Sequence, residues 1–420
     1  MKKIYSIIAL YLLVISVQAQ KQKMSLNNIL DSIRLRHPVV KMYDSEIRSM
    51  DEAAKGARSW MPPQIGFGQF MTPYNVNLWQ KRGEMQGMGS VMLSAEQMFP
   101  NKKKLDANEA YMNAMSATEK EMKEAKINDL VSNAKQLYFE WIILDKKLKV
   151  VKENEKLLEF MIRNAELRYK NGLDKISAYY KTKAALGNSK NMQLMYENDI
   201  REKRIRLNSL MNRDPMSSLE IDSAYQFNDY SDLLFDKDFF YQNRSDLKAL
   251  DNEINKSQLK QELEKQSLKP EFGVKFDNAI GFGGQPMQYS AMVMVKLPMA
   301  KWSSKMNKAN IESLKWKEDA LQGQKEMMAN EYSGMAYGMR NEFELNQNQL
   351  KLYELEIIPA LQNNYRSMQT GYEQNTEELF MLYDAWEKLN MTQIEYFDIL
   401  SKAFSMQVAL DQLIQKNQMK

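Results

Sequence analysis

Two short segments, EFGVKFD at residues 271–277 and SAMVMVKL at residues 290–297, alternate between two kinds of side chain. Polar side chains, glycine or methionine occupy every second position, and apolar side chains fill the positions between them. A period of two residues is typical of a β-strand with one polar and one apolar face. The same alternation occurs upstream, where Ser94 and Glu96 oppose Val91, Leu93 and Ala95. The sequence therefore predicts four strands, at about residues 63–72, 88–99, 270–279 and 288–298.

The polar sides of these strands form one candidate surface, a barrel lumen face made of Ser94, Glu96, Glu271, Lys275, Asp277 and Lys296. Strands of about ten residues with an apolar and a charged face suit a transmembrane β-barrel, which has lipid outside and water inside. A half-buried sheet in a soluble protein is the alternative. Two such hairpins, with aromatic residues near the strand ends, favour the membrane.

Four strands cannot close a barrel, and open edges in lipid leave backbone groups unpaired. A trimer with twelve strands is the simplest closure.

The chain contains an internal repeat, because residues 37–67 align without gaps on residues 244–274. Pro63 with Pro270 and Gly66 with Gly273 are among the identities. Each copy continues with two strands, a long helix, a turn and another helix, and a repeated order of this kind is a strong guide to architecture. We expect a first repeat at residues 20–212, a linker at 213–240 and a second repeat at 241–420.

Helical periodicity dominates outside the strands. Pro100 and Gly172 enclose 71 residues without glycine or proline, and apolar residues from Ile127 to Leu158 recur in steps of three and four, as in a coiled coil. The predicted fold class is therefore mainly α with a small β part, built from long antiparallel helices. The helix hairpins should turn at about residues 170–174 and 368–376, where Gly172 and Gly371 would adopt positive φ. Pro359 predicts a bend in the second long helix.

The first nineteen residues have the pattern of a secretory signal peptide. Lys2 and Lys3 precede an apolar run, and Ala19 closes a small-residue cleavage site. We expect residues 1–19 to be removed and the mature chain to be exported. No later segment approaches 18 consecutive apolar residues, so no membrane-spanning helix is predicted in the mature chain.

Composition excludes most catalytic chemistry. The chain has no Cys and one His, which argues against disulfides, zinc clusters and His-based triads. No cofactor and no enzymatic activity are expected. The 58 basic and 54 acidic residues nearly cancel and are interspersed, which argues against nucleic acid as a partner.

Several fragments, in the right order, resemble the TolC family of outer-membrane efflux channels, and the resemblance covers nearly the whole mature chain. Arg168-Tyr169-Lys170-Asn171-Gly172-Leu173 is similar to the first hairpin tip of that family. The second tip is matched by Ile358-Pro359-Ala360, by the segment from Ser367 to Gly371, and by the segment from Leu379 to Ala385. Leu207-Asn208-Ser209-Leu210-Met211 resembles the end of the first repeat.

The resemblance implies a homotrimer in the cell outer membrane, with a twelve-stranded barrel continued by a helical tunnel through the periplasm. Its partners would be outer-membrane lipid, a periplasmic adaptor and an inner-membrane pump of the RND type. The adaptor would dock at the hairpin tips, at Arg168, Asn171, Gly172, Leu173, Thr370, Gly371 and Tyr372. By the same resemblance, Asp384 would form the periplasmic gate. Met381 stands where the family often has a second Asp, which puts a double acidic ring in doubt.

Methionine is abundant, with 32 residues. Thioether sulfur suits Cu(I) and Ag(I), so Met292 and Met294 on the predicted lumen face are weak candidates for contacts with a soft-metal cargo, as in the CusC-like heavy-metal branch of the family. Packing is the alternative, because Met fills irregular cores. A second class of function is a periplasmic coiled-coil scaffold or adaptor without membrane insertion. It would explain the helices and the signal peptide but not the repeated strand pairs.

Overall fold

The computed structural model describes residues 23–172 and 175–415. The expected signal peptide and the predicted tip residue Leu173 lie outside the described residues. Contacts divide the chain into two compact units. The sheet unit comprises residues 43–123 and 245–328, and the helical unit comprises the described residues up to 42, residues 124–244 and those from 329 onward. Within the described part of the chain, no helix is both long enough and apolar enough to cross a membrane.

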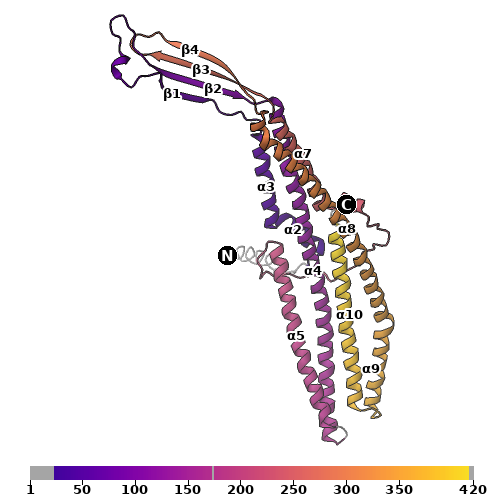
Figure 1. Ribbon diagram of the computed structural model, residues 1–420. Helices are drawn as coiled ribbons and strands as arrows, with labels where there is room; N and C mark the ends of the chain where they lie inside the picture. The colour runs from indigo at the N-terminus through magenta and orange to yellow at the C-terminus, as the bar shows by residue number, and fades with distance from the viewer. Residues whose placement is uncertain (1–22, 173–174, 416–420) are drawn as a thin grey trace, which may run out of the picture. The chain divides into compact units, whose positions relative to one another are not determined.

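The sheet unit contains one four-stranded antiparallel sheet (Figure 1). Its strands follow chain order: β1 (Gln64–Phe70), β2 (Ser90–Phe99), β3 (Glu271–Gly281) and β4 (Gln288–Lys296). The central pair, β2 and β3, comes from the two different repeats and runs in register from Ser90 opposite Gly281 to Phe99 opposite Phe272. The two hairpins of the repeats are therefore joined into a single sheet, and β1 and β4 each keep one edge without a strand partner among the described residues.

Strand register places the predicted polar residues on one face. Ser94 lies opposite Asp277, and Glu96 lies opposite Lys275. Glu271 lies opposite Lys296 on the next strand pair. The other face carries apolar side chains that no described residue covers, including Phe67 and Val293, which are 79% and 76% exposed. The sheet thus has the two-faced character that the alternation predicts.

Helices enter and leave the sheet in the same order in both repeats. In the first repeat α3 (Pro38–Lys55) precedes β1 and α4 (Lys102–Lys170) follows β2. In the second repeat α7 (Ser245–Gln266) precedes β3 and α8 (Lys301–Leu352) follows β4. The stretch of 71 residues without glycine or proline forms one helix over nearly its whole length, because α4 spans 69 residues.

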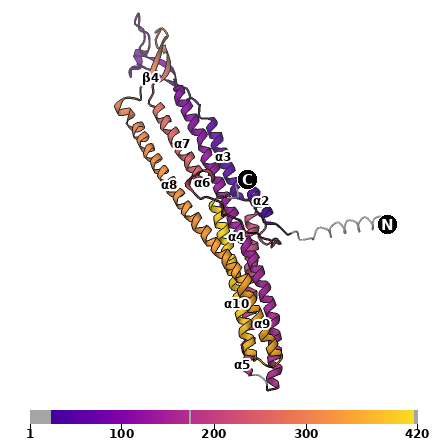
Figure 2. The ribbon, with the colours of Figure 1, turned by 90° about the vertical axis from the view of Figure 1, so that its right-hand side faces the viewer.

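The helical unit contains the hairpins that end each repeat (Figure 2). The described helices include α2 (Leu26–Arg36), α5 (Ile176–Leu210), α6 (Lys237–Asn243), α9 (Ile358–Glu373) and α10 (Leu379–Leu413). Between α8 and α9 lies a π-helical turn, η3 (Tyr353–Ile357). Pro359 lies two residues beyond this turn and has no N–H to donate to the carbonyl four residues earlier, which explains why the regular helix is interrupted at this point.

The core of the helical unit lies where the linker crosses α4 and α10. Phe139 of α4 stacks on Phe404 of α10 with ring centroids 4.4 Å apart, and Tyr225 and Phe227 of the linker pack against the same Phe404 ring. The predicted seam of α4 is buried at Ala134, Leu137, Trp141, Val151 and Leu158. Neighbouring Val131, Tyr138 and Ile142 are buried as well, because α4 is covered here on more than one side.

Candidate functional site: the hairpin ends

Each helix hairpin turns through a residue with left-handed backbone conformation. At the first turn Gly172 has φ of +69°, as predicted. At the second turn the prediction for Gly371 is wrong. Gly371 lies inside α9, which continues to Glu373, and Asn375 takes the left-handed conformation with φ of +60°. Asn tolerates this conformation better than most residues with a side chain.

Gly371 has a packing role instead. Its carbonyl accepts hydrogen bonds from the backbone N–H of Thr376 at 2.8 Å and from the Thr376 hydroxyl at 3.0 Å. A Cβ atom at position 371 would lie 2.5 Å from Cγ of Glu377. The absence of a side chain therefore lets the turn fold back onto the last turn of α9, which positions the start of α10.

The two hairpin ends are tied to each other within one chain. The guanidinium of Arg168, at the end of α4, lies 4.7 Å from the centre of the Tyr372 ring and donates a hydrogen bond to Asn375 Oδ1. Tyr372 is only 3% exposed. It belongs to a buried cluster drawn from α4, α5, α9 and α10: Leu158, Met161, Ala165, Ala185, Tyr372, Leu379, Leu382, Tyr383 and Trp386. Tyr372 thus supports the tip from inside, whereas Asn171, Gly172 and Thr370 are exposed.

The predicted gate residue Asp384 is half exposed and ion-paired. Its Oδ1 lies 2.9 Å from Nζ of Lys181 on α5. The same ammonium group lies 4.0 Å from the centre of the Phe380 ring and 4.2 Å from that of Tyr383. Two aromatic faces and one carboxylate therefore surround the Lys181 charge. Met381, one turn before Asp384, is 48% exposed and makes the same surface less polar than a second Asp would.

Tyr383 lies beneath this ion pair. Its side chain is 6% exposed, and its hydroxyl donates to Glu387 Oε1 at 3.0 Å. Burial raises the pKa of Tyr383 to about 12, and the hydrogen-bonded Glu387 carboxylate adds to the rise. Tyr383 therefore remains protonated across the physiological pH range.

The polar face of the sheet carries its own ion pairs. Glu271 Oε1 lies 2.7 Å from Nζ of Lys104, and Glu271 Oε2 lies 3.4 Å from Nζ of Lys296. Asp277 accepts a hydrogen bond from Ser290 Oγ at 3.1 Å. Its other oxygen lies 3.6 Å from Nζ of Lys275. Met292 lies opposite Lys275, and Met294 lies opposite Gly273 on this face. Over the described ranges, no three His, Asp or Glu side chains gather in a way that could hold a metal ion.

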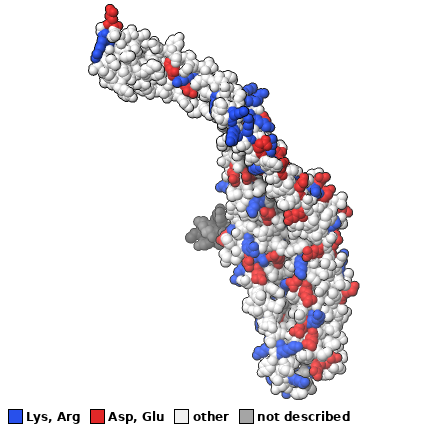
Figure 3. Space-filling model, viewed as in Figure 1, with Lys and Arg blue, Asp and Glu red and all other residues white. Residues whose placement is uncertain are grey.

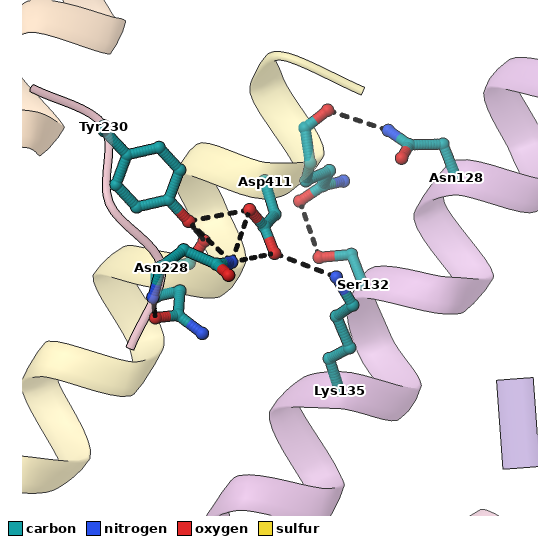
Figure 4. A network of polar contacts seen from close by, with 8 residues as sticks. Asn128, Ser132, Lys135, Asn228, Tyr230 and Asp411 are labelled. Atoms are coloured by element: carbon teal, nitrogen blue, oxygen red, sulfur yellow. Dashed lines mark hydrogen bonds and ion pairs between the residues drawn. The ribbon is translucent and has the colours of Figure 1, made fainter. Parts of the chain in front are cut away.

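Sequence reasoning missed a buried polar network around Asp411 (Figure 4). The Asp411 carboxylate, on α10, lies 2.8 Å from Nζ of Lys135 on α4 and accepts a 2.7 Å hydrogen bond from the Tyr230 hydroxyl of the linker. The side-chain amide of Asn228 donates to both carboxylate oxygens, at 3.2 and 3.3 Å. No local pattern could reveal these partners, because Lys135 and Asp411 are 276 positions apart.

Comparison with known proteins gives a family and a fold. Residues 29–213 match the family model described as "Outer membrane efflux protein". This range ends one residue beyond the expected first repeat, so the family match covers one of the two copies. No curated protein sequence matches the chain significantly.

Solved channel structures match the chain across both copies of the repeat. The outer membrane protein VceC from Vibrio cholerae superposes with a TM-score of 0.74 at 14% identity, over 93% of this chain and 95% of VceC. CusC gives 0.74 at 12% identity, over 94% and 95% of the two chains. The CmeC outer membrane channel of Campylobacter jejuni gives 0.72 at 11% identity, over 93% and 85%. At these identities the similarity shows the fold.

The family and the fold together confirm the predicted TolC-type outer-membrane efflux channel and its mainly α architecture. Proteins of this family are transport channels rather than enzymes, and their helices form long tunnels in the periplasm. They are trimeric and work with an adaptor and an inner-membrane pump. The alternative of a scaffold without membrane insertion has no support from the family match.

Proposed function

We propose that three copies of this chain form one export duct, closed by a twelve-stranded barrel in the outer membrane. The observation that carries the proposal is the sheet itself, which has an uncovered apolar face, a polar opposite face and two open edges. In a bilayer an unpaired strand edge leaves backbone groups without hydrogen-bond partners, at a cost of several kcal/mol each. Pairing β4 of one copy with β1 of the next removes both edges, and three copies close the ring.

Reconstitution tests the channel directly. In outer membranes the mature chain should resist carbonate extraction. After purification it should have the mass of a trimer in detergent and conduct ions across planar bilayers. A chain that is extracted by carbonate and stays monomeric would support the periplasmic scaffold instead.

Asp384 is proposed as the acidic ring of the periplasmic gate. Its half-exposed position on the surface of α10 supports this role, and the Lys181 ammonium would set how much negative charge the ring presents. In a narrow passage a carboxylate ring favours cations over anions.

The exposed tips at Asn171 and Thr370 are proposed to receive the adaptor, with an RND-type pump behind it. Both residues are exposed, and both lie in segments that resemble the hairpin tips of TolC-family channels, which supports the proposal. Cysteine at Asn171 should cross-link to the hairpin of the cognate adaptor in cells that export cargo, and cysteine at exposed Lys120 on α4 should not. Failure of the Asn171 cross-link in a working complex would contradict docking at this tip.

A soft-metal cargo, Cu(I) or Ag(I), is the more specific proposal, and one packing feature favours it. Met98 and Met294 flank Gly273 on the polar face. A Cβ at Gly273 would lie 2.3 Å from Met98 Sδ and 3.3 Å from Met294 Cε. Thioethers of this kind bind soft monovalent metals. Replacing Met98, Met292 and Met294 with Leu should raise the silver sensitivity of cells without altering drug export. Unchanged silver resistance would contradict a metal cargo.

A further inference from the structure

The chain leaves the sheet through two lysine-rich segments. Residues 97–105, from the end of β2 into the first turn of α4, contain Lys102, Lys103 and Lys104 and no acidic residue. Residues 297–311, from the end of β4 into the first turns of α8, contain Lys301, Lys305 and Lys308 and again no acidic residue. Figure 3 shows basic side chains gathered where the sheet gives way to the helices. The two segments lie close together, because Lys104 and Lys296 bind the same Glu271 carboxylate.

Five of these lysines form what we name the lysine collar: Lys102, Lys103, Lys301, Lys305 and Lys308. None of them is ion-paired with an acidic residue of the described chain. The nearest acids in sequence are already engaged, since Asp106 and Glu109 both bind Arg58, at 2.9 and 2.6 Å. Neither α4 nor α8 has an acidic residue in its first turn. Lysine at this end of a helix is unfavourable because it adds to the positive end of the helix dipole. The chain therefore concentrates positive charge here that it does not neutralise itself.

Exposed aromatic and apolar side chains connect the collar to the apolar face of the sheet. Trp302, next to Lys301, is 87% exposed, and Leu297 at the end of β4 is 58% exposed. On the neighbouring segment Trp60 is 58% exposed and meets Phe99 edge to face, with ring centroids 5.5 Å apart. Tryptophan and lysine side chains thus both adjoin the end of the apolar strand face. A bilayer likewise places aromatic and basic groups at its interface, next to the hydrocarbon core.

We propose that the lysine collar binds the anionic headgroups of phospholipid in the periplasmic leaflet, and so fixes the depth and tilt of the sheet in the membrane. The choice of leaflet rests on the proposed function, which puts the helices in the periplasm. Phosphate oxygens complement the uncompensated ammonium groups, and acyl chains of the same lipid complement the adjoining apolar face. Basic residues beside a membrane surface attract anionic lipid in this way.

The test compares the purified full-length trimer in two kinds of vesicle, phosphatidylcholine alone and phosphatidylcholine mixed with phosphatidylglycerol. Wild type should insert into both kinds of vesicle. At low salt it should bind the mixed vesicles at least about tenfold more tightly than phosphatidylcholine alone, and this preference should be lost at high salt. The variant Lys102→Gln, Lys103→Gln, Lys301→Gln, Lys305→Gln should still insert into phosphatidylcholine but lose the preference. A control with four exposed helical lysines replaced, Lys120→Gln, Lys149→Gln, Lys156→Gln and Lys388→Gln, should behave as wild type.

The outcomes separate the two proposals. Insertion without any preference for phosphatidylglycerol, or a preference that survives in the collar variant, would overturn the collar assignment and leave the channel intact. An equal loss in the control would overturn it too, by showing that net charge alone is responsible. No insertion into either vesicle would refute the proposed channel itself. Retention of phosphatidylglycerol by the detergent-purified trimer, read by native mass spectrometry, should also depend on the collar lysines, and unchanged retention in the collar variant would count against them.

Discussion

At the scale of single residues, the proposed gate residue Asp384 is one half of an ion pair. Lys181 lies against the Asp384 carboxylate and two aromatic rings, so the surface that would face the passage carries both signs. The resemblance of the second tip to the TolC family predicted Asp384 as a site residue. It could not predict Lys181, which is 203 positions away and belongs to the other repeat. Local periodicity encodes helices, whereas the pairing of side chains across helices depends on tertiary packing.

Removing one charge at a time should shift ion selectivity in opposite directions. Lys181→Met leaves the carboxylates uncompensated and should increase the preference for cations, whereas Asp384→Asn should reduce it. The reversal potential in a KCl gradient measures both, and the double variant should return close to wild type. Because the pair is about half exposed, unfolding free energy should change by less than about 1 kcal/mol. An unchanged reversal potential in both single variants would remove Asp384 from the gate.

Titration of Tyr383 should make the folded hairpin ends less stable at high pH. Its pKa is raised to about 12 in the folded chain, against about 10 in the unfolded chain. Its contribution to stability is therefore complete below pH 10 and is lost as the pH rises through 12. Thermal unfolding of the Tyr383→Phe variant should depend less on pH between 10 and 12 than that of wild type. Parallel curves for the two proteins would contradict this assignment.

At the scale of elements, the long helices and the strands follow from periodicity, but their ends depend on contacts. Gly172 was predictable because it directly follows a helix with no other break. Gly371 was misleading, because a glycine near the end of a helical pattern can serve either a turn or close packing. Here packing against Glu377 fixes its role, and Asn375 makes the turn. The π-helical turn before Pro359 likewise refines the predicted bend.

The stability of the first hairpin end should depend on how well residue 172 tolerates a positive φ. Gly172→Ala should destabilise the hairpin end by about 1 kcal/mol, because a Cβ is strained at φ of +69°. Gly172→Asn should cost less, since Asn tolerates the left-handed region. Hydrogen exchange of the last turn of α4 measures the difference. Equal exchange in the two variants would show that φ does not limit this turn.

The Asp411 network should be the most sensitive polar feature of the helical unit. Asp411 is 2% exposed, so Asp411→Ala removes the buried carboxylate that binds the Lys135 ammonium and should cost about 3–5 kcal/mol of unfolding free energy. The exposed pair of Lys315 and Glu312 provides a control, and Lys315→Ala should cost less than about 1 kcal/mol. Chemical denaturation compares them. Similar small losses in both variants would show that the network does not hold the linker in place.

At the scale of the whole molecule, the sequence predicted the fold well because the same order of strands and helices occurs in both repeats. Two hairpins with one apolar and one polar face indicate a membrane sheet more strongly than one, and four strands in one chain require partners. The structure adds the strand order, in which β2 and β3 join the repeats and β1 and β4 remain as edges. That order could not be read from alternation, which specifies faces but not neighbours.

Cross-linking of the two edge strands tests the central claim most directly. Within one chain β1 and β4 are separated by β2 and β3, about 14 Å at roughly 4.8 Å per strand spacing, too far for a disulfide. Cysteine pairs that join β1 and β4, with Phe67→Cys combined in turn with Ala291→Cys, Val293→Cys and Val295→Cys, should give at least one covalent trimer. Leu93→Cys with Asn278→Cys, which are neighbours on β2 and β3, should cross-link only within a chain. Covalent trimers that depend on both edge cysteines are the predicted result. Monomers alone, or an open ladder of species beyond the trimer, would contradict a closed barrel of three chains.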